Sequence, residues 1–537
     1  MTESTDSQRS ITRSATSFFS GTLISRATGL ARDMVMAATF GSHPSVAAFM
    51  VAFRFSQLLR RLFGEGAMQS ALIPQFEAIR SRDTREAGLF FRDINVGVAI
   101  VLLLIIIVSE GALYGWLFFG DPSPGNREII LLTMLMLPGL LFICLYGLNL
   151  SFLQCEKKYF LPSAAPLVFN VIWIVAVLAL RGVFSAEAMF WLSGAIVLAT
   201  FAQWAVTLPQ TLSILKGFIA DRLWGSFEEF WLNIRRIIKP LFLGMIGVTA
   251  VQINAALDGI FARAADAEGP AFLWYAIRVQ QAPLALFGIA LSGALLPPLS
   301  RAIKSGDLPQ FRAFLGFAVR KSSSLMIPCT FAMIVLGISG VNLLYGRGAF
   351  TVNATVQTTL CIWAYGIGTV PGTLVLLLAP ACYARGNYRL PALSSAIAVL
   401  VNVLANIVLV FGLSLGAVSI ALATSFAALC NCWILLRVLN KELGTLIPMS
   451  VWTAQVKPLI CSAIASIATL ALGYFALYDN TAPLLLGMGP LFTFPRAFME
   501  QFVTFCALLA CFTGTLVGMA WLLNAEDLLS LLKRHKR

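Results

Sequence analysis

Charged side chains are scarce in this sequence: Asp, Glu, Lys and Arg make up only 12% of the 537 residues, while 58% are hydrophobic. The mean hydropathy of +0.84 excludes an ordinary soluble fold and indicates a polytopic α-helical membrane protein. Histidine is almost absent, and both copies, His43 and His535, fall in a loop and a tail without a Ser/Asp or Cys partner. A Walker-type loop is missing as well. The sequence therefore predicts a protein that is not an enzyme and does not hydrolyse ATP by itself.

The ten cysteines give no zinc-ligand spacing. Cys430 and Cys432 would point to different faces of a helix, so we interpret the cysteines as buried, reduced thiols and expect no cofactor. The N-terminal segment lacks the small-residue cleavage pattern of a signal peptide. The first membrane span is therefore expected to be retained.

Long apolar runs, bounded by charged residues or by Gly and Pro, predict about fourteen membrane-spanning helices. A hydrocarbon core about 30 Å thick requires about 20 apolar residues. The second and the eighth of these segments contain charged residues, which weakens the prediction that they cross the membrane. The predicted spans cover residues 15–38, 45–75, 94–119, 129–154, 160–181, 188–214, 240–264, 271–299, 314–345, 351–382, 389–412, 415–436, 456–477 and 500–523.

Basic residues are distributed unevenly between the two sides of the predicted membrane. Fourteen spans place both termini on one side, and most of the 38 Lys and Arg residues fall in the loops and tails of that side. The opposite side carries only Arg127, Arg181, Arg263, Arg347 and Arg496. This asymmetry predicts cytoplasmic termini, and it makes the net charge of +13 an orientation signal rather than a nucleic-acid-binding surface.

The chain repeats itself with a shift of 224 residues, so that Arg54 falls on Arg278 and Pro74 on Pro298. An even number of spans separates the copies, which predicts repeats of the same orientation, related by a pseudo-twofold axis along the membrane normal. We predict two six-helix lobes around a central cationic cavity, followed by two C-terminal helices. The predicted boundaries are 1–215 for the N-terminal lobe, 216–238 for a cytoplasmic amphipathic linker, 239–440 for the C-terminal lobe, and 441–537 for the helix pair with its basic tail.

The first two spans contain charged residues that hydrocarbon alone would not tolerate. A charge in the bilayer costs about 3 to more than 10 kcal/mol, so it normally faces a wet cavity or a partner. Because arginine forks bind phosphate oxygens in bidentate fashion, we interpret the set as an anion site. Snorkelling, or pairing of Arg61 with Glu65 at i, i+4, is the alternative. The set comprises Arg26, Arg32, Asp33, Arg54, Arg60, Arg61 and Glu65.

The run SRATGLARD at 25–33, followed by FRFSQLLRRLFGEGAMQSALIP at 53–74, resembles the MurJ/MviN family, and the resemblance continues through YAIR at 275–278. The number of predicted spans agrees with the family over nearly the whole chain. The family is similar to flippases that move lipid II, the undecaprenyl-pyrophosphate-linked peptidoglycan precursor, across the bacterial inner membrane. It belongs to the multidrug/oligosaccharidyl-lipid/polysaccharide exporter superfamily.

The resemblance implies roles for individual residues. It implies gating by Glu65 in its Gly-Glu-Gly turn, and we assign Asp33 and Arg61 to the same group. The substrate-binding arginines that it implies fall on Arg26, Arg32, Arg54, Arg60 and Arg278.

Adjacent Arg60 and Arg61 cannot both point to the centre of the cavity. The resemblance favours Arg60, whereas helical periodicity with Arg54 favours Arg61. This chain also departs from the family pattern at 47–48, which is Ala-Ala, and at Ile277. Both departures remove negative charge from the outer half of the predicted cavity.

A second candidate site binds a cation. Asp258 lies deep in the seventh span, Asn402 and Asn406 share one face of the eleventh, and Thr424 lies in the twelfth. A carboxylate with amide and hydroxyl oxygens suits Na⁺, and Asp258 alone could carry H⁺. Some members of the family are similar here, although Asn406 replaces an Asp found in some of them. The alternative is that the asparagines only hold helices together.

These observations predict a lipid II flippase of the bacterial inner membrane that works by alternating access in peptidoglycan biosynthesis. Its partners would be lipid II, membrane lipids and cell-wall synthesis proteins. One alternative is an exporter of another polyprenyl-pyrophosphate-linked glycan. A second is a non-transporting scaffold for cell-wall synthesis, which would not need arginines inside its spans.

Overall fold

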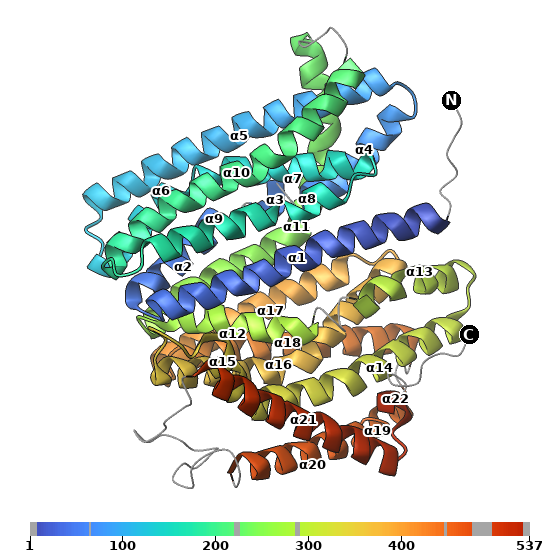
Figure 1. The fold of residues 1–537 in the computed structure, drawn as a ribbon. Helices are drawn as coiled ribbons and strands as arrows, with labels where there is room; N and C mark the ends of the chain where they lie inside the picture. Colours follow the sequence, from blue (N-terminus) through green and yellow to red (C-terminus); the bar gives the residue numbers. More distant parts are fainter. Residues whose placement is uncertain are drawn as a thin grey trace. The chain divides into compact units, whose positions relative to one another are not determined.

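The computed structural model describes residues 8–58, 60–63, 66–219, 226–284, 290–444, 448–474 and 497–529. This part of the chain is almost entirely helical and contains no strand (Figure 1). The chain divides into two compact units, Met1–Gly259 and Ile260–Arg537.

The first unit consists of long helices joined by short turns. The last of them, α11, continues beyond the end of the unit. Its helices are α1 (Gln8–Phe40), α2 (Pro44–Ser56), α3 (Arg60–Phe63), α4 (Ala67–Arg80), α5 (Thr84–Phe119), α6 (Pro124–Met136), α7 (Gly139–Cys155), α8 (Phe160–Ala164), α9 (Pro166–Ala179), α10 (Ser185–Ile219) and α11 (Phe227–Ala265).

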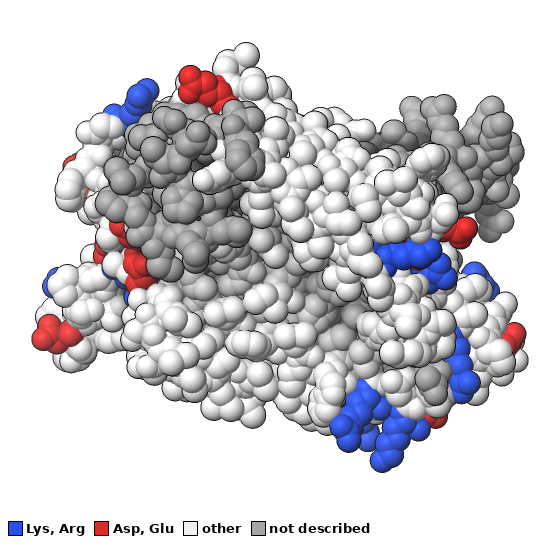
Figure 2. All heavy atoms as spheres, turned by 90° about the horizontal axis from the view of Figure 1, so that it is seen from below, with Lys and Arg blue, Asp and Glu red and all other residues white. Residues whose placement is uncertain are grey.

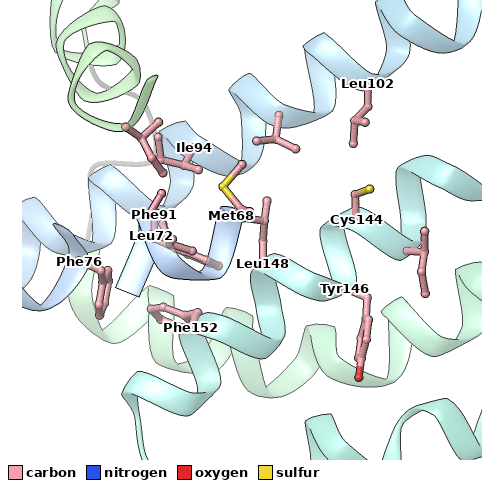
Figure 3. Packing of buried hydrophobic residues seen from close by; sticks show 14 of the residues in the cluster. Met68, Leu72, Phe76, Phe91, Ile94, Leu102, Cys144, Tyr146, Leu148 and Phe152 are labelled. Atoms are coloured by element: carbon pink, nitrogen blue, oxygen red, sulfur yellow. The ribbon is translucent and has the colours of Figure 1, made fainter. Parts of the chain in front are cut away.

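Aromatic rings hold α4, α5 and α7 together in the first unit (Figure 3). The rings of Phe91 and Phe152 stack with centroids 4.1 Å apart, and Phe76 meets Phe152 edge-on at 5.4 Å. Such pairs contribute about 0.5–1.5 kcal/mol each beyond the area they bury. Close packing of this kind is what stabilises helix contacts inside a membrane, where lipid is as apolar as the side chains.

The second unit is built in the same way, and its core lies where α13, α14, α16 and α18 meet. One short π-helical turn, η2, follows α17. The helices are α12 (Gly269–Pro283), α13 (Ala290–Lys304), α14 (Leu308–Val335), α15 (Gly337–Tyr345), α16 (Val352–Ala384), α17 (Arg389–Ile407), η2 (Val408–Gly412), α18 (Val418–Leu443), α19 (Met449–Thr453), α20 (Val456–Leu472), α21 (Phe498–Leu522) and α22 (Glu526–Leu529).

Polar side chains at the helix starts satisfy the N–H groups that have no partner within the helix. Asp83 accepts from the Arg85 N–H at 2.7 Å before α5, and Asp307 accepts from the Gln310 N–H at 2.8 Å before α14. Both caps lie at loops that the sequence places outside the membrane. They fix where two long helices begin.

Two predicted spans are bent rather than straight. The α6–α7 pair bends by 46° next to Pro138, and the α14–α15 pair bends by 68° at Leu336. At the second bend the indole of Trp363 donates to the carbonyl of Ile334 at 2.9 Å. This bond satisfies the Ile334 carbonyl, which would otherwise lose its hydrogen-bond partner where the helix is broken.

Eight helices among the described residues are long and apolar enough to cross a membrane, or up to ten if each bent pair counts as one span. The all-α, multi-pass membrane fold is therefore confirmed, whereas the count of fourteen is not. Four predicted spans are mainly helical in their described residues but are not in this set: 15–38, 45–75, 240–264 and 271–299. Three of them contain the charged residues assigned to the anion site, and 240–264 contains Asp258.

The outer surface agrees with a membrane location. On α5, Leu104, Ile107 and Val108 are 58–69% exposed, as expected for side chains that face lipid tails. Figure 2 shows one face of the protein on which Lys and Arg gather mostly toward one end, and uncharged residues form a wide area between the ends.

The predicted second span, 45–75, is not one continuous helix. It is divided into α2, α3 and α4, with a turn at Gln57 and Leu58 and a positive φ of 62° at Gly66. The predicted alignment of Arg54 with Arg61, seven residues farther along, assumes one continuous helix, and the turn at Gln57 and Leu58 interrupts that helix. In the eighth predicted span the structure describes α12 and α13, and residues 285–289 between them lie outside the described part of the chain.

Candidate functional site

The two arginines of α1 have opposite environments. Arg26 is exposed, whereas Arg32 is 8% exposed and its neighbour Asp33 only 3%. Their spacing of six residues places them on different faces of the helix. Of the two, Arg26 is the one that presents its charge outward.

Arg32 is held by a buried network that joins α1 to α9. Its Nε and Nη2 donate to Oδ1 of Asp33 at 3.0 and 2.8 Å, and its Nη1 donates to Oδ1 of Asn170 at 3.1 Å. The amide of Asn170 in turn donates to the Ser25 carbonyl and to the Thr28 hydroxyl, both at 3.1 Å. The network neutralises the guanidinium and fixes one face of α1 against α9.

An aromatic cluster covers this network. The guanidinium carbon of Arg32 lies 4.5 Å from the centre of the Trp173 ring. Trp173 also meets Phe49 and Phe53 of α2 edge-on, with centroids 5.5 and 5.2 Å away. A cation over an indole face gains roughly 0.5–2 kcal/mol, more when it is desolvated. The rings therefore exclude water from Arg32 and connect α1, α2 and α9.

Arg54, at the end of α2, is half-buried against α11. Its Nη1 donates to the Ala255 carbonyl at 3.2 Å. A Cβ built on Gly259 would lie 3.8 Å from Cδ of Arg54. Because Gly259 is one helical turn beyond Ala255, the Arg54 side chain lies along the surface of α11. This contact uses one of the five guanidinium N–H donors and fixes the direction of the side chain.

The gating residues are described only in part. Arg60 begins α3 and is half-buried. Arg61 belongs to α3, but its side chain lies outside the described residues, as does all of Glu65. The structure therefore does not decide between Arg60 and Arg61.

Arg278 belongs to the second unit, on α12. Its guanidinium carbon lies 4.5 Å from the centre of the Trp274 ring, one helical turn earlier. Trp274 is 7% exposed, while Arg278 is half-buried. Arg32 and Arg278 are thus each placed over a buried tryptophan.

The residues of the predicted cation site fall into two groups. Asp258, in the first unit, accepts from Asn254 on its own helix at 3.3 Å. In the second unit Asn406 donates to Asn402 at 2.9 Å, and Asn402 donates to Thr424 at 3.4 Å. Both asparagines are fully buried, and this chain of bonds joins α17 to α18. Among the described residues, no group of three His, Cys, Asp or Glu side chains could hold a metal ion.

Asn170 and Trp173 are site residues that the sequence analysis did not single out. Asn170 is the one amide in the otherwise apolar helix PLVFNVIWIVAVLA, and it is 4% exposed. A lone polar side chain in an apolar span is a recognisable signal. Its partner, however, lies 138 residues away, which local spacing does not reveal.

Eight to ten long apolar helices among the described residues, together with helices that carry buried and half-buried guanidinium groups, are typical of a multi-pass membrane transport protein. The family model "Lipid II flippase MurJ" matches residues 36–485. "Probable lipid II flippase MurJ" from Chlamydia trachomatis serovar D is 31% identical over 535 residues, which cover 98% of this chain and 97% of the relative. The chain belongs to the MurJ family.

Solved structures share the fold. "Lipid II flippase MurJ, inward closed conformation" superposes with a TM-score of 0.70 at 22% identity, covering 93% of this chain and 99% of that one. A multidrug resistance MATE family transporter of the MOP superfamily, in its inward-facing conformation, gives 0.62 at 12% identity and covers 79% and 95%. These likenesses show that the chain shares the fold of these two proteins.

Proposed function

We propose that this protein flips lipid II from the cytoplasmic to the periplasmic leaflet of the bacterial inner membrane by alternating access. Membership of the MurJ family, together with arginines inside membrane spans, carries this proposal. It makes the chain a transporter in peptidoglycan synthesis rather than an enzyme. Its basic loops support cytoplasmic termini.

The arginines would bind the pyrophosphate, which is the charged part of lipid II. Arg26 is exposed, and Arg54 is oriented by the Ala255 carbonyl with other N–H donors in its fork. Arg60 and Arg278 belong to the same proposed set. Bidentate, charge-assisted hydrogen bonds of this kind are about twice as strong as neutral ones.

For Arg32 we propose a structural role rather than direct binding of the pyrophosphate. Because it is buried and already bonded to Asp33 and Asn170, it acts first by positioning α1, so that Arg26 is presented in a fixed direction. Gating by Asp33, Arg61 and Glu65 stays part of the proposal.

The divided second span supports a transport mechanism. Substrate sites of secondary transporters are commonly formed by discontinuous helices. Here the span that carries Arg54 is divided into α2, α3 and α4, and Arg278 is the arginine that matches Arg54 in the 224-residue repeat. Membrane potential would supply the energy, with Na⁺ or H⁺ at Asp258, Asn402, Asn406 and Thr424 as the proposed coupling ion.

The test measures lipid II at the outer leaflet of cells depleted of their own flippase, using a periplasmic enzyme that cleaves only exposed precursor. Wild type should restore cleavage, while Arg26→Ala and Arg278→Ala should each reduce it about tenfold or more, because each removes charge-assisted phosphate contacts. Arg181→Ala, an exposed arginine outside the anion set, is the matched control and should behave as wild type.

Membrane levels of each variant are compared by immunoblot. If well-inserted wild type gives no cleavage, lipid II is not the substrate, and the same assay is repeated with another polyprenyl-pyrophosphate-linked glycan. If wild type works and both arginine variants retain full activity, the arginine mechanism is wrong, although the substrate stands.

A further inference from the structure

A cavity of about 530 Å³ lies in the second unit, near the start of α14. Helices α19 and α22 both contact α14 here, close to the C-terminal helices in Figure 1. Arg312 and Arg320 line the cavity from α14, and Asp527 lines it from α22. Most of its remaining lining is apolar, including Gly316 and Phe317. The cavity thus combines guanidinium groups with an apolar wall.

The carboxylate of Asp527 is already compensated. Arg320 Nε donates to its Oδ2 at 2.6 Å, and Lys321 Nζ donates to its backbone carbonyl at 2.7 Å. The Asp527 side chain is 19% exposed and that of Arg320 44%. The ion pair fixes Arg320 at the edge of the cavity and leaves the local charge positive.

Arg312 is positioned by the chain that leaves α18. Gly444 has a φ of 73°, in the left-handed region that favours glycine, and a Cβ built there would lie 3.2 Å from Nη2 of Arg312. The backbone therefore approaches the guanidinium closely. Arg312 itself is half-buried and lines the cavity.

The surroundings of the cavity have the character of a membrane–water interface. On α19, Met449 and Trp452 are 72% and 38% exposed, and Phe317 on α14 is 63% exposed. Tryptophan is enriched at the level of lipid headgroups. Arginines beside exposed apolar side chains suit a ligand with an anionic head and apolar tails.

We propose that this cavity binds the phosphodiester headgroup of an anionic glycerophospholipid. Arg312 is its main contact, Arg320 a second one held by Asp527, and the acyl chains lie on the side of Phe317. The lipid would connect α14 to the short helices that flank α20 and α21. This site is separate from lipid II transport and does not depend on it.

The test uses the purified full-length protein in detergent and measures lipid retained by native mass spectrometry. Dioleoylphosphatidylglycerol is titrated against dioleoylphosphatidylcholine, and inorganic phosphate is added at millimolar concentration as the head without tails. Arg312→Gln removes the main contact. Gly316→Leu fills the cavity while keeping both arginines, and a Cβ there would meet only Val451, at 3.9 Å. Arg301→Gln changes an exposed arginine at the end of α13 and serves as the control.

We expect wild type and Arg301→Gln to prefer phosphatidylglycerol, and both cavity variants to bind it about tenfold more weakly, as loss of a charge-assisted contact predicts. Equal retention of the two lipids, or undiminished binding by Arg312→Gln and Gly316→Leu, would overturn the proposal. Displacement of the lipid by inorganic phosphate would overturn it too, because the site would then bind free phosphate. Failure of the flipping assay would leave all these outcomes unchanged.

Discussion

Arg32 lies over the ring of Trp173, with its guanidinium carbon 4.5 Å from the ring centre and its N–H groups turned to Asp33 and Asn170. A charge inside a membrane protein is thereby compensated on two sides, by a carboxylate and by an aromatic face. The arrangement separates an arginine that builds the site from Arg26, which is exposed. This separation is open to direct test.

Arg32→Lys should keep the charge but lose the contacts, because an ammonium cannot reach Asp33 and Asn170 with a planar fork. We expect a loss of about 1–3 kcal/mol in unfolding free energy, the usual range for leaving buried polar groups unsatisfied. Denaturant unfolding of the detergent-solubilised protein measures it. Arg26→Lys, at an exposed position of the same helix, should be nearly neutral; equal losses in both variants would contradict the assignment.

Gly368 and Gly372 lie one turn apart on α16 and offer a matched pair. A Cβ on Gly368 would come within 2.8 Å of the Ser425 Cα on α18, whereas one on Gly372 would meet no described atom within 4 Å. Gly368→Ala should therefore force α16 and α18 apart and cost about 1–3 kcal/mol. Gly372→Ala should be neutral or stabilise by up to about 1 kcal/mol through helix propensity. Thermal unfolding of the two variants decides, and a stable Gly368→Ala would refute the close packing.

Glu156, in the turn after α7, gives a pH-dependent prediction. Burial raises its pKa above the ordinary value of 4.5, although Arg80, 3.0 Å away, acts in the opposite direction. The folded state therefore takes up this proton at higher pH than the unfolded state does. The stabilisation is complete below about pH 4.5 and is lost as the pH rises through the raised pKa.

Glu156→Gln should remove this contribution and flatten the pH dependence of the unfolding midpoint above about pH 4.5. Arg80→Gln should move the window to higher pH, since it removes the charge that lowers the pKa. Thermal unfolding across this range provides the measurement. Parallel curves for wild type and Glu156→Gln would show that Glu156 is not the group responsible.

The buried asparagines distinguish an ion site from a structural contact. Because the hydrogen bonds of Asn402 and Asn406 join α17 to α18, Asn406→Ala should lower stability by about 1–3 kcal/mol in sodium and in potassium alike. A coupling site for Na⁺ adds a second effect, a rise in wild-type melting temperature with sodium that Asp258→Asn and Asn406→Ala abolish. Absence of any sodium effect on wild type would leave the asparagines as helix contacts alone.

The all-helical architecture could be predicted from the sequence, because long apolar runs that cross a membrane form helices. All fourteen predicted segments overlap helices in the described part of the chain, although only eight to ten helices there are long and apolar enough to cross a membrane. The division of 45–75 was missed, since apolar content does not report a turn at Gln57 and Leu58.

The site itself was less predictable. Local spacing suggested which arginines share a helical face, yet the state of Arg32 depends on Asn170, far away in the sequence. Asp93 also depends on a residue far away in the sequence. It is 2% exposed and accepts a hydrogen bond from Asn233 of α11 at 2.8 Å. Contacts between distant helices are set by tertiary packing, which periodicity does not record.

Helix α4 begins at Ala67, and its N-cap residue, Gly66, makes no side-chain hydrogen bond to it. The first N–H groups of a helix, together with the helix dipole, favour negative charge. The division of the predicted span 45–75 therefore places a helix N-terminus, and with it a partial positive charge, inside the same segment that carries Arg54 and Arg60.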